Sequence, residues 1–152
     1  MKRHILISAV LAVSLLISAH ARADGLTTVG HYNGTDGSFF EIATYLEDGE
    51  TVGVMGISHK VSVAFSKNEW HSFVELWRRA ESVQSNSFQF VGTYKETNTT
   101  YNSLLTVAAG PGVQFTINDS PGTLVFVLSP NDYASFDAAV GTISATLAAS
   151  LK

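Results

Sequence analysis

The stretches "VSVAFSKNEWHSF" at residues 61–73 and "LVFVLSPNDYASF" at residues 124–136 carry one pattern twice. In both, an apolar run ends at a serine, an acidic residue follows three positions later, and an aromatic residue and a phenylalanine complete the stretch. At an offset of 63 residues, Ser66 aligns with Ser129 and Phe73 with Phe136. This match predicts an internal duplication of the chain.

The duplication extends back toward the N-terminus. "VGHY" begins at Val29 and "VGTY" begins at Val91, 62 residues later, so one inserted residue reconciles the two offsets. We therefore divide the chain into two repeats, at about residues 27–85 and 88–151. A unit of this size is small for a self-sufficient core. We expect the two repeats to form a single domain that covers residues 24–152.

Each repeat contains four short segments that are typical of β-strands and are separated by turn residues. Alternating or continuous apolar residues mark the strands, and Asn, Asp, Gly and Pro mark the turns between them. The Asp48-Gly49 pair predicts a tight hairpin. The predicted strands lie at residues 27–32, 38–46, 51–57 and 60–65 in the first repeat and at 88–94, 101–108, 113–118 and 123–128 in the second.

A helix is predicted after the fourth strand of each repeat. Ser66 and Glu69 form the pattern of a capping box, and Ser129 with Asp132 is a shorter analogue that has Pro130 at the favoured first position. Apolar residues then recur at helical spacing: Trp70, Phe73, Val74 and Trp77 in the first helix, and Tyr133, Phe136, Val140, Ile143 and Leu147 in the second. The sequence thus predicts an α+β fold, a tandem ββββα repeat with antiparallel sheets, two helices and a pseudo-twofold axis.

The second helix, at residues 131–151, carries only Asp132 and Asp137 as charged residues. A helix with so little charge is usually covered on both sides. We expect its outer side to contact the first helix, a second subunit or another protein.

Four antiparallel strands followed by a helix that opens as in "VLSPNDYASF" resemble the group of single-stranded-DNA-binding proteins that includes the Whirly proteins, the Pur-alpha repeats and the positive cofactor four family. The resemblance implies nucleic-acid binding on the strand faces, through Lys and Arg and stacking aromatics. This sequence departs from that pattern, because its strands carry only Lys60, with Lys95 at a strand end. The aromatic residues that could stack on bases are more typical of a core: Phe39, Phe40, Tyr45 and Tyr101. We expect the fold of this group without its nucleic-acid partner.

The N-terminal segment has the pattern of a signal peptide. A basic start precedes an apolar run at residues 5–19, which is too short to span a membrane. Ala21 and Ala23 then form an A-x-A cleavage pattern. We predict a signal peptide at residues 1–23, cleaved before Asp24, with no membrane association after cleavage. The chain has no Cys, and an exported chain without disulfides favours a periplasmic location in a bacterium over an extracellular scaffold.

Cleavage would make the chain more acidic. It removes Lys2, Arg3 and Arg22 but no acid, so that six of nine basic residues and all 13 acidic residues remain and the formal charge changes from −4 to −7. A chain with this charge does not favour phosphate backbones.

The sequence contains no recognisable catalytic or cofactor motif. It has no nucleophile elbow, phosphate loop or dinucleotide fingerprint, and His31, His59 and His71 lack the spacing of metal ligands. We interpret these histidines as ordinary surface or edge residues, with His71 and Glu75 as an exposed pair one helical turn apart. Glu47, Asp48 and Glu50 are interpreted as a solvated acidic turn. We assign no catalytic, cofactor-binding or metal residue and expect no cofactor.

These observations favour an exported, non-enzymatic binding or interaction protein, a class that includes periplasmic inhibitors and immunity-type proteins. Its expected partner is another protein or a second copy of itself. Two alternatives stay open: a module that binds single-stranded nucleic acid, by analogy of fold, and a small-ligand protein or hydrolase whose site is scattered along the sequence.

Overall fold

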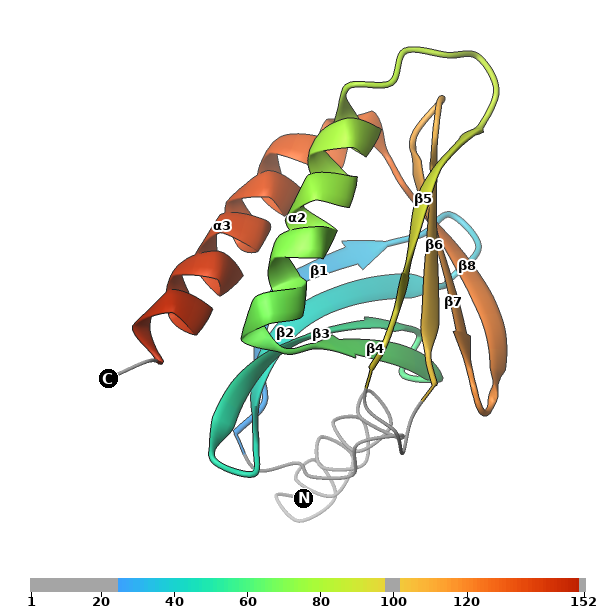
Figure 1. The fold of residues 1–152 in the computed structure, drawn as a ribbon. Coiled ribbons are helices and arrows are strands. Elements are labelled where there is room, and N and C mark those ends of the chain that lie inside the picture. The colour runs from blue at the N-terminus through green and yellow to red at the C-terminus, as the bar shows by residue number, and fades with distance from the viewer. Residues whose placement is uncertain (1–24, 98–101, 151–152) are drawn as a thin grey trace, which may run out of the picture.

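The computed structural model describes residues 25–97 and 102–150, so the predicted signal peptide at residues 1–23 and Tyr101 lie outside the described residues. The described chain forms two four-stranded antiparallel sheets, each followed by a helix (Figure 1), which confirms the tandem ββββα arrangement. Sheet A has the strand order β1-β2-β3-β4 and sheet B the order β5-β6-β7-β8. The elements are β1 (Thr27–Asn33), β2 (Phe39–Glu47), β3 (Glu50–Ile57), β4 (Val61–Phe65), α2 (Lys67–Glu81), β5 (Gln89–Lys95), β6 (Leu104–Ala109), β7 (Val113–Asp119), β8 (Gly122–Leu128), the 3-10 turn η1 (Pro130–Asp132) and α3 (Tyr133–Ala149).

The first helix begins with the predicted capping box. The Ser66 hydroxyl accepts a hydrogen bond from the Glu69 amide (3.4 Å), and the Glu69 carboxylate accepts one from the Ser66 amide (2.8 Å). The predicted analogue is confirmed for Ser129 and Pro130, which open η1, but is wrong for Asp132, which makes no capping hydrogen bond with its side chain. Its side chain is one methylene shorter than that of Glu. Ser129 instead caps η1, where its hydroxyl accepts from the amide of Asn131 (3.3 Å).

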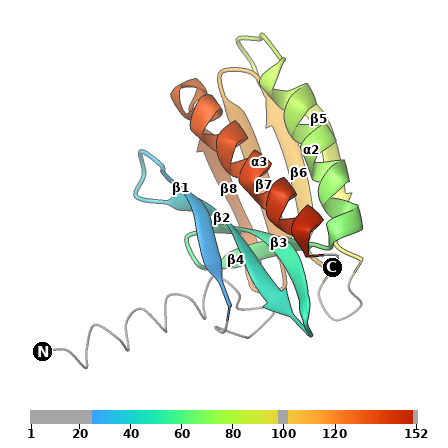
Figure 2. The ribbon, with the colours of Figure 1, turned by 90° about the vertical axis from the view of Figure 1, so that its left-hand side faces the viewer.

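Each helix packs on the sheet of the other repeat. α3, from the second repeat, lies on β1, β2 and β3 of sheet A, while α2, from the first repeat, lies on β5 and β6 of sheet B and also touches β3 and β4. Figures 1 and 2 show α2 next to β5, with α3 alongside α2. The repeats are therefore interlocked, like two subunits that exchange their helices.

Reciprocal contacts identify the pseudo-twofold axis between the repeats. The Tyr32 hydroxyl lies 3.5 Å from Ser135 of the other repeat's helix and interacts with the charge of Asp132, and its repeat equivalent Tyr94 interacts with Glu69, the equivalent of Asp132. Phe73 and Phe136, which are equivalent positions, contact each other with ring centroids 6.4 Å apart. Two equivalent residues can touch only close to the axis that relates them.

One hydrophobic cluster joins both sheets and both helices, and Phe65, Phe73, Phe115 and Phe136 are fully buried in it. β4 is the edge strand of sheet A, and it is buried because sheet B covers it. The Asp119 carboxylate accepts a hydrogen bond from the Ser62 amide (3.3 Å), and the Tyr94 hydroxyl donates to the Ala64 carbonyl (3.1 Å). These two bonds join sheet A to sheet B. They also occupy backbone groups at the edge of β4, which would otherwise be free to pair with another chain.

Candidate functional site

The fold brings two of the three histidines in the described part of the chain onto one buried carboxylate. Glu41 on β2 accepts a hydrogen bond at each oxygen, from His31 Nδ1 (2.7 Å) and from His59 Nε2 (2.8 Å). The side chain of Glu41 is 11% exposed, against 44% for His31 and 23% for His59. Phe39 stacks on His31 and meets His59 edge-on. His31 and His59 are therefore members of a hydrogen-bonded cluster around Glu41 and are not independent surface residues.

Sequence reasoning missed this cluster because its members lie 10 and 18 residues apart along the chain. The available signal was the register of β1 and β2, which places His31 directly opposite Glu41. His71 behaves as predicted: its Nε2 atom lies 3.2 Å from the Glu75 carboxylate, and both side chains are exposed.

His59 is held by a strained turn. Ser58 and His59 adopt positive φ angles of 53° and 55°, and the Lys60 amide donates to the Ile57 carbonyl (3.0 Å), which is the pattern of a type I′ turn. Asn and Gly favour these positions, and other residues there are strained. Two hydrogen bonds hold the turn, from the Ser58 amide to the Phe39 carbonyl (2.8 Å) and from the Phe39 amide to the Ser58 hydroxyl (3.3 Å).

A hollow lies beside this turn, where it meets the β7–β8 turn of the second repeat. Its volume is about 560 Å³. The lining residues occupy the same four positions of each repeat, 58–61 and 121–124, so the hollow lies on the pseudo-twofold axis. They are Ser58, His59, Lys60 and Val61 from the first repeat and Pro121, Gly122, Thr123 and Leu124 from the second. We call this cavity the axial hollow.

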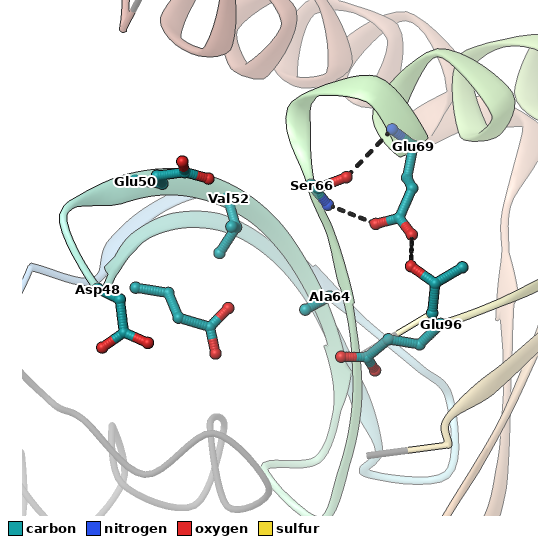
Figure 3. Close-up of a pocket in the computed structure, with 9 residues that line it drawn as sticks. Asp48, Glu50, Val52, Ala64, Ser66, Glu69 and Glu96 are labelled. Carbon is teal, nitrogen blue, oxygen red and sulfur yellow. Dashed lines mark hydrogen bonds between the residues drawn. The ribbon is translucent and has the colours of Figure 1, made fainter. Parts of the chain in front are cut away.

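A second hollow, of about 370 Å³, lies where the β2–β3 hairpin, the start of α2 and the end of β5 meet. Figure 3 shows Asp48, Glu50, Glu69 and Glu96 around it. The predicted acidic turn is thus one wall of a larger acidic hollow. Its lining residues are Glu47, Asp48, Glu50, Val52, Ala64, Ser66, Glu69, Glu96 and Thr97.

Hydrogen bonds keep one of these carboxylates ionised. Burial opposes the charge of Glu69, but hydrogen bonds from the Thr97 hydroxyl and from Ser66 outweigh it and hold the pKa of Glu69 below its ordinary value. Burial, together with the charge of Glu69, raises the pKa of Tyr94 above its usual range. Glu69 therefore both caps α2 and links it to the end of β5. Among the described residues, no group of three or more His, Asp or Glu side chains is arranged to hold a metal ion.

Sheet B presents an almost uncharged outer face. Cross-strand pairing places three rows of four residues on the side away from the helices. Phe90, Val125 and Val127 are 72%, 48% and 45% exposed there. We call this set of twelve residues the open face, and Lys95 is its single charged member. Its rows are Phe90, Ala108, Gln114 and Val127; Thr93, Thr106, Thr116 and Val125; and Lys95, Leu104, Asn118 and Thr123.

The outer side of α3 is less covered than expected. Trp77 on α2 donates through Nε1 to the Asp137 carboxylate (3.1 Å), so the two helices are in contact as expected. The remaining outward positions are exposed small residues, among them Ala134, Ala138, Gly141 and Thr142. In the described part of the chain, no helix is long and apolar enough to cross a membrane.

No protein-family model matches the chain, and the search of the curated proteins finds no relative.

Proposed function

We propose that the chain is an exported, non-enzymatic interaction protein whose contact surface is the open face of sheet B. One observation carries the proposal: of the five large apolar residues that are exposed in the described chain, Phe90, Val125 and Val127 stand on this face, whereas Leu46 and Phe88 lie outside it. An exposed apolar patch on a soluble domain commonly marks a protein-interaction site. This class includes inhibitors and immunity-type proteins of the periplasm. Export is the expectation drawn from residues 1–23.

The occupant that the charges favour is a second copy of the chain. At a formal charge of −7 after cleavage, two copies repel each other over most of their surfaces. The open face has no acidic residue and only Lys95 as a charge, so two open faces can approach without placing acid against acid. Two sheets that pack face to face in this way bury their apolar residues between them.

The size of the open face limits the strength of this contact. Four strands about 4.8 Å apart, with about seven residues at about 3.3 Å each, cover roughly 400 Å² per copy. Stable complexes bury about 800 Å² per partner. We therefore expect a weak dimer that forms reversibly as the concentration rises.

The experiment is sedimentation of the protein that starts at Asp24, over a series of concentrations. We expect the apparent mass to rise toward that of a dimer, and Phe90→Asp to abolish the rise, because it buries a charge in the contact. Phe90 is exposed, so this change leaves the core intact. The matched control is Ala138→Asp on the exposed side of α3, which should dimerise like the unchanged protein. A monomer at every concentration, or equal loss in both variants, would refute the proposal.

The duplicated ββββα layout, which resembles the single-stranded-DNA-binding group, suggests nucleic-acid binding as a second candidate function. We propose that the resemblance stops at the fold, because Phe40 and Tyr45 are buried and the open face carries only one cation. The expected result is no binding of a single-stranded oligonucleotide at physiological salt, measured by fluorescence anisotropy. Salt-sensitive binding at micromolar concentration or tighter would restore the nucleic-acid function.

A further inference from the structure

We infer that the axial hollow binds a small apolar molecule with one anionic group, such as a medium-chain carboxylate. The volume of about 560 Å³ falls within the range of small-molecule sites, which often lie where two similar units meet. This site shares only Thr123 with the open face of sheet B, and the inference does not rest on the proposed interaction.

The two repeats serve as internal controls for each other. The positions that line the axial hollow are equivalent, yet the second repeat supplies Pro121, Gly122 and Thr123 where the first supplies Ser58, His59 and Lys60. The hydrophobic positions Val61 and Leu124 are retained on both walls. Both walls thus keep an apolar residue, at the start of β4 and within β8, whereas the basic side chains occur on the first wall alone.

The backbone of the first wall is also strained. His59 lies in a left-handed conformation. Its imidazole is hydrogen-bonded to one oxygen of the Glu41 carboxylate, and His31 is hydrogen-bonded to the other oxygen. A simple turn would carry Asn-Gly here. Strain that is maintained by surrounding hydrogen bonds is typical of functional positions. The arrangement pre-orients one imidazole at the edge of an apolar hollow.

The charges of the lining favour an anion. His59 and Lys60 are the only ionisable side chains among the lining residues, and both are basic. Glu41, which contacts His59, accepts from two imidazoles, and Asp119, two residues before Pro121, accepts from the amides of Ser62 and Ser120. The acidic hollow of Figure 3, with five carboxylates, has the opposite character. A carboxylate would thus meet Lys60 and His59 while its chain contacts Val61, Pro121 and Leu124.

The test compares three ligands of equal length and different charge. The protein that starts at Asp24 is titrated with octanoate, 1-octanol and octylammonium while amide NMR shifts are followed. We expect saturable shifts at residues 58–61 and 121–124 with octanoate, affinity about tenfold or more weaker for octanol, and no saturation with octylammonium. No saturable binding of octanoate, equal affinities for the three ligands, or shifts confined to residues of the open face other than Thr123 would overturn the inference.

Two lysine variants separate the site from general charge. Lys60→Gln should weaken octanoate binding about tenfold or more and leave octanol binding unchanged. Lys95→Gln, which removes a lysine of the open face, is the matched control and should bind octanoate like the unchanged protein. The amide spectra of both variants report whether they fold. Equal losses of octanoate affinity in both variants, or no loss in Lys60→Gln, would refute a site in the axial hollow.

Discussion

Two phenylalanines show how a duplicated sequence forms one core. Phe73 and Phe136 are equivalent in the two repeats, are fully buried, and contact each other across the axis. Each ring also meets Phe115 of sheet B. Because the same cluster surrounds both residues, neither belongs to one repeat alone.

Phe73→Ala and Phe136→Ala should each lower the free energy of unfolding by about 3–5 kcal/mol, the usual result of truncating a core phenylalanine. Since the two rings touch, the double variant should differ from the sum of the single effects by more than about 0.5 kcal/mol. Urea unfolding measures all three values. Phe90→Ala is the control, and its exposed ring predicts a change within about 0.5 kcal/mol. A negligible loss at either core position would contradict their equivalence.

The strain at His59 can be measured with a pair of substitutions. His59→Ala and His59→Gly both remove the hydrogen bond to Glu41, but only Gly adopts the positive φ angle without strain. We expect the Gly variant to be more stable than the Ala variant by about 1–2 kcal/mol. Thermal or urea unfolding gives this difference. Equal stabilities would mean that the turn rearranges and that His59 is not held under strain.

At this scale, sequence reasoning identified the core residues better than the polar cluster. Phe73, Trp77 and Phe136 were predicted from periodicity and are fully buried. The contact of His31 and His59 with Glu41 depends on strand register and on a turn with unfavoured residues. Ser58-His59 has no sequence pattern of a type I′ turn, so the position of His59 followed only from the three-dimensional structure.

At the scale of elements, the two helix starts differ more than their sequences suggest. Ser66 and Glu69 form a complete capping box, whereas Ser129 caps a 3-10 turn that precedes α3. Local patterns predicted the eight strands and two helices because hydrophobic period and turn residues agree in each segment. They did not predict which sheet each helix covers, since that choice depends on contacts between repeats.

Glu69 should make the stability of the protein depend on pH. Its pKa is lowered in the folded state from an ordinary value of 4.5. Its contribution to stability is therefore present above pH 4.5 and is lost as the pH falls through the lower folded pKa. At pH 7 the urea midpoint of the unchanged protein should be higher than that of Glu69→Gln. This difference in midpoint should shrink as the pH is lowered to 3. Glu75→Gln, at an exposed side chain, is the control. An advantage that persists at the lowest pH would contradict this assignment.

At the scale of the whole molecule, the interlocked helices predict cooperative unfolding. Each sheet is covered by the helix of the other repeat, and one hydrophobic cluster contains residues of both sheets and both helices. Urea unfolding should therefore show a single transition, at the same midpoint by tryptophan fluorescence and by far-UV circular dichroism. Two separated transitions, one sensitive to Phe73→Ala and the other to Phe136→Ala, would show two independent domains.

The prediction of export concerns the chain before it folds. The basic start, the apolar run and the Ala21–Ala23 pattern imply cleavage before Asp24. Intact-mass measurement of protein from the periplasm should show the loss of the first 23 residues. Full-length protein in that fraction would refute the cleavage, and its absence from the periplasm would refute export.

The exchange of helices also sets an order in time. A chain is made from its N-terminus, so the strands of sheet A are complete long before α3, which begins about 100 residues after β1 ends. Until those last residues arrive, the inner side of sheet A, with Phe40 and Ile42, has no α3 to cover it. Contacts between such distant segments form slowly and leave apolar strands open to aggregation meanwhile. A chain that stops at residue 132 would still contain α2, but it would lack α3, and the inner side of sheet A would lose the helix that covers it.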